Sequence, residues 1–452
     1  MTATKRKIAY HLGAAALLVA PLLSMNASAA SAESGRHRTA SASQRAKSLE
    51  SRLELMLRTM RIARDWHIEA PNKSVLIAGA IEGLLARVDP EAELYTPADL
   101  RRVARFVPSG EAGVGLEVRR EPAERRSDRR GYRIVAARDG SPAARAGLKA
   151  GDLITGVDGQ SAAEIPLLVM THVMLEGPAG STVRLTVERS ESESEPETVA
   201  LERSSAFGAE LNIDEVTPEI ARIRIASLSE GTASTLARSW AAYSGDSAHA
   251  RLIRGVVLDL RSTAAASVES VEGARAVADA FLQAGPILRM VSRHHESSKP
   301  ERATPGDLVD GQPIVVLVDG GTSGAAEVLV SALQEARRAR VVGTKTAGRG
   351  AIRTLVSLDQ RGRKGLLRMT TERFLTPGGA PIDGKGVAPE IPIEQLPASS
   401  RCRTLDIEDE AAPGVCVTRT LAQDTQLQRA ISTLDEPLVA SQHAPASVAG
   451  KP

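Results

Sequence analysis

Hydrophobic and polar residues alternate in blocks through the second half of the chain, and the blocks predict strands and helices in turn. The run 313–318 is apolar and β-branched, which is typical of a strand buried on both faces. Small, flexible residues at 319–324 predict a tight turn, and an apolar stripe over 325–338 predicts a helix. A second strand is expected from Val341. A tight turn at a helix N-terminus aims backbone N–H groups at one point, where enzymes often place a nucleophile and an oxyanion hole.

The same alternation of strands and helices precedes this unit. Strands are predicted over 220–225 and 255–261, and helices over 227–243 and 271–282. Such alternation favours an α/β domain.

The N-terminal part of the chain has helical periodicity instead. Apolar residues suit one amphipathic helix in the region 44–93, and 75–88 predicts a second, strongly apolar helix. The residues that carry the first pattern are Leu49, Leu53, Leu55, Met56 and Met60.

The first 29 residues show a different pattern, that of a secretory signal peptide. A basic cluster at 5–7 precedes a short apolar stretch at 12–23, and small residues at 27–29 suit a cleavage site. The alternative is an uncleaved membrane anchor, although the apolar run is short for a span and contains Pro21. Residues 30–43 are polar and predict a disordered leader.

Composition and charge argue against some classes of function and favour none. The 452 residues suffice for two or three domains. The 57 basic and 55 acidic residues give a net charge of +2, which offers no electrostatic case for nucleic acid. The eight histidines show no metal-ligand spacing, so neither a metal nor a cofactor is expected. In an exported chain, Cys402 and Cys416 predict a disulfide, with two free thiols as the alternative.

The region 109–190 contains a long, ordered series of motifs. GVGLEV stands at 113–118, a strand is expected over 132–136, and GSPAARAGLKAGDLI follows at 140–154. This series resembles a PDZ domain. The resemblance implies that a peptide adds as a strand beside 116–118, with its terminal carboxylate on the loop N–H groups. The alternative is a PDZ domain used only for intramolecular packing. The implied peptide-binding residues are Gly113, Val114, Gly115 and Leu116.

Several further stretches share one resemblance. They are GTSGAAE at 321–327, ALQE at 332–335, GTKTAGRG at 343–350, DPEAELY at 89–95, TERFLTPGG at 371–379 and DTQLQRA at 424–430. Together they resemble the carboxyl-terminal processing peptidases, the S41 family of serine peptidases with a Ser/Lys dyad. The resemblance covers about Ile77 to Leu434. It implies an α/β core of ClpP/crotonase-like β-α units, with an inserted PDZ domain and an N-terminal helical region.

The implied organisation has six parts. They are a signal peptide (1–29), a disordered leader (30–43), an N-terminal helical region (44–108), the PDZ domain (109–190), the S41 peptidase-like core (191–400), and a C-terminal segment with a helix and a disordered tail (401–452).

The family's catalytic positions are substituted. Aligned without a gap, its serine position is Gly324, its lysine position Arg349 and its glutamine position Arg353. Glycine has no side chain that can attack a carbonyl, and a guanidinium stays protonated at physiological pH. The family's glycine pair for the oxyanion hole is replaced near Ala265 and Ala266, which keep N–H donors but lack glycine's access to positive φ.

Ser323 and Lys345 are the fallback nucleophile and base. One residue around a helix start turns a side chain by roughly 100°, and four residues span up to about 13 Å. We therefore expect a turn or cap hydroxyl at Ser323 and a solvated loop lysine at Lys345.

Two main hypotheses for the function follow. The first is an exported S41 homologue that binds protein C-terminal tails through its PDZ domain and lacks hydrolysis. The second is an active serine-type endopeptidase that cleaves protein C-terminal regions with Ser323 and Lys345. A third, weaker option is a chain that regulates an active relative by dimerising with it. Protein tails are the expected partners, with a homodimer as a further possibility. The expected location is the periplasm or cell envelope, with membrane contact only if the leader stays uncleaved.

Overall fold

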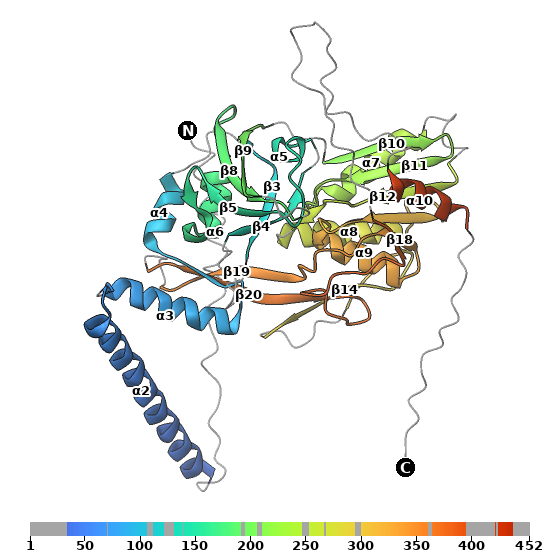
Figure 1. The fold of residues 1–452 in the computed structure, drawn as a ribbon. Helices are drawn as coiled ribbons and strands as arrows, with labels where there is room; N and C mark the ends of the chain where they lie inside the picture. The colour runs from blue at the N-terminus through green and yellow to red at the C-terminus, as the bar shows by residue number, and fades with distance from the viewer. Residues whose placement is uncertain are drawn as a thin grey trace, which may run out of the picture. The chain divides into compact units, whose positions relative to one another are not determined.

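The computed structural model describes residues 34–69, 71–105, 112–121, 131–138, 140–190, 195–205, 210–245, 253–265, 268–293, 300–359, 364–394, 421 and 424–436 (Figure 1). The chain divides into two compact units, Met1–Leu100 with Thr354–Met369, and Arg101–Arg353 with Thr370–Pro452. The predicted signal peptide, the predicted Cys402–Cys416 disulfide and the predicted disordered tail lie outside the described residues. Within these ranges, no helix combines the length and apolar character needed to cross a membrane.

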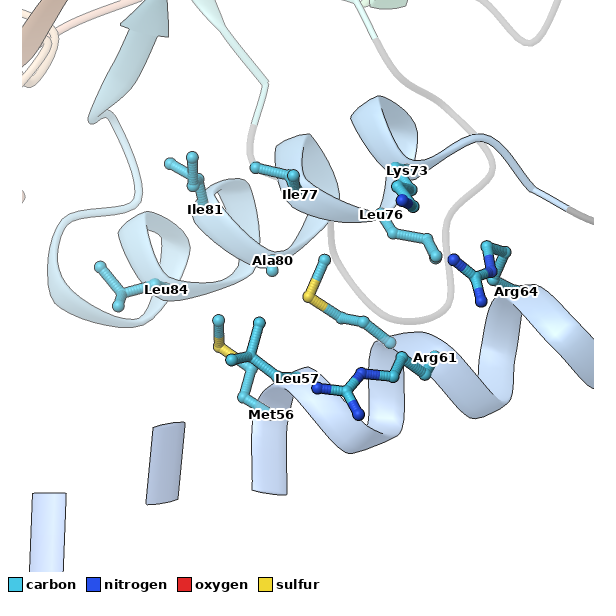
Figure 2. Close-up of a pocket in the computed structure, with 11 residues that line it drawn as sticks. Met56, Leu57, Arg61, Arg64, Lys73, Leu76, Ile77, Ala80, Ile81 and Leu84 are labelled. Atoms are coloured by element: carbon cyan, nitrogen blue, oxygen red, sulfur yellow. The ribbon is translucent and has the colours of Figure 1, made fainter. Parts of the chain in front are cut away.

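The first unit contains two helices and one short strand. Helix α2 (Ser34–Trp66) is followed by α3 (Lys73–Val88), and an apolar groove runs between them (Figure 2). The Asn72 side chain caps α3 by accepting a 3.0 Å hydrogen bond from the Ser74 N–H. Strand β1 (Glu93–Tyr95) then pairs antiparallel with the first residues of β20 (Leu366–Leu375).

Helix α2 begins at Ser34, so it includes most of the span predicted to be a disordered leader. That prediction rested on the polar, Ser/Ala-rich composition of residues 30–43. An established helix adds each further residue through one backbone hydrogen bond, which requires no apolar stripe.

Helix α4 (Pro97–Arg105) begins in the first unit and ends in the second. The PDZ domain follows it in the second unit. Its sheet has the order β3-β4-β5-β8-β9, with β6 paired to β5, and its apolar core includes Tyr132, Ile134 and Leu185. Strand β9 pairs with β8, so the sheet continues past Ser190. The elements are β2 (Ala112–Gly113), β3 (Leu116–Arg120), β4 (Tyr132–Ala137), α5 (Pro142–Arg145), β5 (Leu153–Val157), β6 (Gln160–Ser161), the 3₁₀ turn η2 (Ala162–Glu164), α6 (Leu167–Val169), the π-helical η3 (Met170–Leu175), β7 (Glu176–Gly177), β8 (Thr182–Glu188) and β9 (Glu197–Glu202).

The α/β core that follows is built on a sheet of order β10-β11-β12-β16-β18-β21. Within this sheet, β10 runs antiparallel to its neighbour. The other strands pair in parallel, as the prediction of an α/β domain requires. The strands are β10 (Leu211–Thr217), β11 (Ile220–Ile225), β12 (Gly255–Asp259), β16 (Ile314–Val318), β18 (Ala339–Gly343) and β21 (Ile391–Pro392).

Helices cover both faces of this sheet. In β16, Ile314, Val316 and Val318 pack in the cluster of α7 (Thr232–Gly245), α8 (Val268–Phe281) and α9 (Ala325–Glu335). The alternate residues Val315 and Leu317 pack instead with α10 (Thr425–Leu434). Because side chains alternate along a strand, this arrangement explains why the run is apolar at every position.

Smaller strands complete the second unit. The last residues of β20 pair antiparallel with β14 (Pro286–Ser292), which also pairs with β15 (Glu301–Arg302). Strand β19 (Ala351–Ser357) leads from the core toward Thr354–Met369. Two-residue strands β13 (Ala264–Ala265) and β17 (Ser323–Gly324) pair in parallel beside the start of α9.

Candidate functional site

The sharp turn between β16 and α9 is present at the predicted position, and Gly324 is the N-cap residue of the helix. Its backbone has φ +65° and ψ −122°. Few L-residues adopt a positive φ, and a nucleophile on a strand-to-helix turn is held in strained backbone of this kind. The turn therefore has a backbone conformation that would strain a residue with a Cβ, and the residue there is a glycine, which adopts it without strain.

A buried carboxylate joins this turn to the loop that contains the lysine position. Glu327 is fully buried and accepts hydrogen bonds from the Gly324 N–H at 2.9 Å, the Gly348 N–H at 2.7 Å and the Arg349 N–H at 2.7 Å. The Thr346 hydroxyl donates to the same carboxylate. Two loops that are separate in sequence are thus fixed by one side chain.

Burial raises the pKa of Glu327 above its usual value, although the four hydrogen bonds act in the opposite direction. Desolvation penalises the charged form, while donors on the carboxylate favour it. The side chain accordingly contributes to stability mainly through geometry, since it satisfies four buried donors at once.

The proposed oxyanion segment lies directly beside the turn. Ala265 pairs with Gly324 in the parallel β13–β17 bridge, and Ala264 pairs with Ser323. Strand pairing brings backbone groups within hydrogen-bond reach, so the arrangement places an oxyanion candidate next to the nucleophile position. Ala266 lies outside the described residues.

Arg349, which the sequence comparison predicts at the family's lysine position, is nearly buried, with 8% of its surface exposed. Its guanidinium forms an ion pair with the Glu117 carboxylate of PDZ strand β3. Arginine offers five donors and no acceptor, so this side chain is a fixed cation and cannot take a proton from a nucleophile.

The fallback residues lie in different environments. Ser323 is fully buried, and its hydroxyl has no hydrogen-bond partner among the described residues. Its N–H donates to the Thr263 carbonyl at 3.0 Å. Of the expected turn or cap hydroxyl at Ser323, the capping role is wrong, because Gly324 is the cap and Glu327 supplies the capping carboxylate. Ser323 does lie in the turn, with its hydroxyl buried. Lys345 is exposed on its loop, as expected, and Arg353 is half-buried on β19.

In the predicted peptide-binding loop, two N–H groups are already used within the domain. The Gly113 and Val114 N–H groups donate to the Ser204 and Leu175 carbonyls at 3.0 and 3.2 Å. They are therefore engaged within the domain. Gly115 has φ +74°, and a Cβ there would lie 2.2 Å from the Ser141 Cβ, so only glycine fits.

Strand register shows where the next donor points. Leu116 lies opposite Ala137, and the flanking bond runs from the Arg138 N–H to the Gly115 carbonyl at 2.8 Å. In an antiparallel ladder this makes Leu116 a non-hydrogen-bonded position toward β4, so its N–H points to the outer edge of β3. Of the four predicted residues, Gly115 and Leu116 remain suited to meet a peptide carboxylate.

A cavity of about 200 Å³ lies between this loop and the α/β core. Its PDZ side includes Leu116 and Glu117, and its core side is formed by Ala226 and Ser262. The cavity therefore lies beside the segment that leads into the oxyanion candidate.

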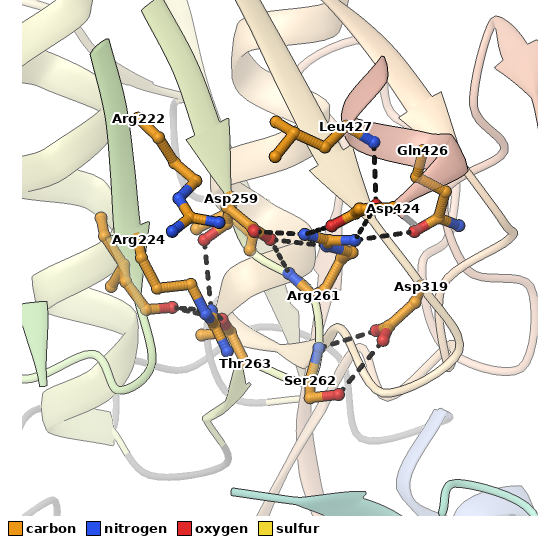
Figure 3. Close-up of polar contacts among 12 residues, drawn as sticks. Arg222, Arg224, Asp259, Arg261, Ser262, Thr263, Asp319, Asp424, Gln426 and Leu427 are labelled. Atoms are coloured by element: carbon orange, nitrogen blue, oxygen red, sulfur yellow. Dashed lines mark hydrogen bonds and ion pairs between the residues drawn. The ribbon is translucent and has the colours of Figure 1, made fainter. Parts of the chain in front are cut away.

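Polar contacts hold the loop after β12, as Figure 3 shows. The Ser262 N–H donates to Asp319 Oδ1 at 2.7 Å, and its hydroxyl donates to Asp319 Oδ2 at 3.1 Å. Asp319 Oδ1 also accepts from the Gly321 N–H at 2.9 Å. One carboxylate thus connects the loop that precedes Ala265 to the turn that precedes Gly324.

Arg261 connects the same loop to the C-terminal helix (Figure 3). Its guanidinium pairs with Asp259 at 2.6 Å and with Asp424, the N-cap of α10, at 2.9 Å. Burial alone would raise the pKa of Asp259, but Arg261 and Arg224 lower it to about 2. The network is electrostatically matched, because each buried carboxylate has an arginine partner.

Sequence reasoning missed the supporting carboxylates Glu117, Asp319 and Glu327. Glu327 stands within the quoted turn motif, three residues after the N-cap, which is the spacing of a capping carboxylate. Glu117 gave no such signal, because its partner lies more than two hundred positions away.

Family comparisons agree with these domains. The model described as peptidase family S41 matches residues 219–393, a range that includes Gly324, Arg349 and Arg353. The model described as a PDZ domain matches residues 133–189 and thus begins after the Gly113–Leu116 loop. The predicted fold class is confirmed, with an α/β peptidase domain and a PDZ domain in one chain.

The curated relatives of this chain include carboxyl-terminal processing proteases. A carboxy-terminal-processing protease of Bartonella bacilliformis is 32% identical over 333 residues, which span 74% of this chain and 73% of that protein. The chloroplastic carboxyl-terminal-processing peptidase 2 of Arabidopsis thaliana is 28% identical over 322 residues, or 70% of this chain and 60% of that protein. A solved photosystem II D1 C-terminal processing protease has the same fold, with a TM-score of 0.60 and 24% identity over 72% of this chain and 83% of that one.

Proposed function

The chain belongs to peptidase family S41, and we propose that it is an exported homologue that binds protein C-terminal tails without hydrolysing them. The observation that carries this proposal is Gly324, the N-cap of α9, which has φ +65° and no side chain at the position that we assign to the nucleophile.

Two separate chemical losses support the absence of hydrolysis. Attack on a peptide carbonyl requires a nucleophilic oxygen, and Gly324 supplies none. Activation of a serine requires a base that can become neutral, whereas Arg349 is a permanent cation held by Glu117. Restoring either group alone would leave the other defect in place.

Tail binding is supported by the geometry of the PDZ strand. The Leu116 N–H faces the outer edge of β3, and Gly115 allows the close backbone approach that a carboxylate needs. A peptide that adds to this edge gains main-chain hydrogen bonds whatever its sequence, while its terminal carboxylate adds charge-assisted ones.

Export is proposed from the sequence alone. Residues 1–29 have a basic start, an apolar middle and small residues at the end, as a cleavable leader requires. The proposed location is the periplasm or cell envelope.

The competing function is an active endopeptidase that uses Ser323 and Lys345. The names of the relatives favour it, since both are described as processing enzymes. Its weakness is that Ser323 is fully buried while Lys345 is exposed.

One experiment separates the two functions. Purified protein is incubated with an unstructured protein and, in parallel, with a serine-reactive fluorophosphonate probe. We expect neither cleavage nor labelling, with Ser323→Ala indistinguishable from wild type. Calorimetry should show weaker binding of an amidated peptide than of its free acid. Cleavage by the wild type that disappears in Ser323→Ala would establish the competing function, and equal binding of both peptides would overturn tail capture.

A further inference from the structure

The cavity between the PDZ domain and the α/β core is a pocket that the proposed function leaves unused. Its volume is about 200 Å³. Pockets for drug-sized ligands measure about 300–1,000 Å³, so a nucleotide or a helix is too large for this one. Liquid water takes about 30 Å³ per molecule, so the cavity has room for roughly six waters or for one small amino acid. Ligand sites often lie at such boundaries between domains.

The cavity lies on a face of the PDZ sheet, whereas a tail would add at the edge of strand β3. Val118 and Ala137 pack in the PDZ core. Their neighbours along the two strands face the opposite way, because side chains alternate along a strand. Those neighbours are Glu117, Ala136 and Arg138, and all three line the cavity. Residues of the α/β core form the opposite wall.

Ser262 lines the cavity from the core side, and its backbone has an uncommon conformation. Its φ is +51°, which few residues other than glycine adopt. Asp319 holds it there, because it accepts from the Ser262 N–H at 2.7 Å and from the hydroxyl at 3.1 Å (Figure 3). Since the hydroxyl proton is used on Asp319, the hydroxyl oxygen is left to accept a hydrogen bond. Costly backbone of this kind clusters at ligand sites, and here it fixes an acceptor that a carboxylate supports.

Glu117 supplies a second acceptor from the PDZ side. One of its oxygens, Oε1, accepts a hydrogen bond from Nη1 of Arg349. Among the described residues, none donates to the other oxygen, Oε2. The side chain is 24% exposed and lines the cavity. An ionised carboxylate oxygen beside a hydroxyl oxygen favours a cationic donor, such as an ammonium group.

Arg138 gives the cavity a cation beside this anion. Its backbone N–H donates to the Gly115 carbonyl at 2.8 Å, which fixes the start of the side chain at the cavity wall. A guanidinium binds a carboxylate through several donors in a fixed fork. Ala136 and Ala226 form the apolar part of the wall. A small ligand that carries both charges matches this lining better than an anion or a cation alone.

We propose that this cavity binds a free α-amino acid with a small side chain. Glu117 Oε2 and Ser262 Oγ accept hydrogen bonds from its ammonium group, and Arg138 contacts its carboxylate. Because these residues come from both domains, the bound amino acid strengthens the contact between the PDZ domain and the α/β core. The proposal goes beyond the proposed function, since a tail on the edge of β3 leaves the cavity open.

A set of small ligands tests this chemistry without altering the protein. Calorimetry should show binding of L-alanine, which should also raise the temperature of thermal unfolding. N-acetyl-L-alanine lacks the ammonium group and L-alaninamide lacks the carboxylate, so each should bind at least about tenfold more weakly. L-tryptophan should not bind, because its side chain is too large for the cavity. Absence of L-alanine binding would overturn the proposal, and so would equal binding of L-alanine and its two blocked forms.

Two variants locate the binding in this cavity. Ser262→Ala and Arg138→Gln should each weaken L-alanine binding at least about tenfold, because each removes a contact to a charged group of the ligand. Arg184→Gln is the matched control, since Arg184 is an exposed arginine on β8 of the same domain, and this variant should bind L-alanine as the wild type does. Circular dichroism establishes that each variant is folded. Wild-type affinity in both folded cavity variants would refute the assignment.

A competition measurement separates the cavity from the proposed tail site. A saturating peptide with an acetylated N-terminus and a free C-terminus should leave the affinity for L-alanine unchanged. Displacement of L-alanine by this peptide would show that the cavity receives the end of a tail, which would overturn the proposal. A protein that binds L-alanine but no peptide would contradict tail capture and leave the amino acid site standing.

Discussion

The guanidinium of Arg349 forms an ion pair with the carboxylate of Glu117, so the position that we predict to match the family's lysine contacts the strand on which a PDZ domain receives its peptide. A residue position associated with proton transfer serves here as a structural contact between two domains. The pair lies next to Leu116, whose N–H faces the open edge of β3.

We expect Glu117→Ala to lower the free energy of unfolding by about 2 kcal/mol, because it leaves the nearly buried Arg349 charge without its carboxylate. This loss of stability is smaller than the loss expected for a fully buried ion pair, because Glu117 is partly exposed. Chemical denaturation measures the change.

Glu121 is the matched control for Glu117. It pairs with Arg133 inside the PDZ domain, and its side chain is about as exposed as that of Glu117. Combining Glu117→Gln with Arg349→Met should cost less than the sum of the two single changes. Additive losses would show that the two side chains are not coupled.

Gly324→Ser should destabilise the protein by about 1–3 kcal/mol, because the serine must adopt a positive φ. Gly320→Ser in the same turn is the control. A Cβ at Gly320 has no atom within 4 Å, and its φ is not in the left-handed region, so its effect should stay within about 0.5 kcal/mol. Equal costs for the two substitutions would contradict the argument from strain.

Adding Arg349→Lys to Gly324→Ser should create weak labelling by a fluorophosphonate and slow cleavage of an unstructured substrate. The nucleophile and a titratable base are then both present on a turn that Glu327 holds in place. A folded double variant that remains unlabelled would refute the view that this turn keeps a competent geometry.

Glu327 predicts a pH dependence of stability. Its pKa is raised in the folded protein above the usual 4.5, so the folded state binds this proton more tightly than the unfolded state does. Its contribution is complete below that usual value and is lost as the pH rises through the raised one. Unfolding measured across this interval should show wild type losing stability relative to Glu327→Gln. Parallel curves for the two proteins would contradict the prediction.

Asp259 predicts the opposite dependence at lower pH. Its folded pKa of about 2 lies below the usual 3.8, so its contribution is present above that usual value and is lost as the pH falls toward 2. The shift corresponds to about 2 kcal/mol. Asp259→Asn should therefore flatten the acid limb of a stability profile, and an unchanged limb would show that Arg261 does not stabilise the ionised form.

The fold was largely predictable because its strands alternate with helices in blocks that local patterns reveal. The strand at 220–225 and the turn before Ala325 lie where the hydrophobic pattern predicts them. The start of α2 was not predictable, since residues 34–43 carry no apolar stripe.

The site was predictable only where its residues are close in sequence. The motif around Gly324 located the turn, but the contact between Glu117 and Arg349 depends on how two domains pack, and no local pattern encodes that. The same limit explains Ser323. The helix starts at Ala325 as predicted, but the capping oxygen comes from the Glu327 side chain rather than from the Ser323 hydroxyl.

The two-sided burial of the central sheet also has a consequence for biosynthesis. The face formed by Val257, Val315 and Leu317 is covered by α10, whose residues are translated after every strand of that sheet. A nascent chain therefore exposes this apolar face until its C-terminal helix has left the ribosome, and in that interval it is vulnerable to aggregation. Premature termination before Thr425 would make that exposure permanent.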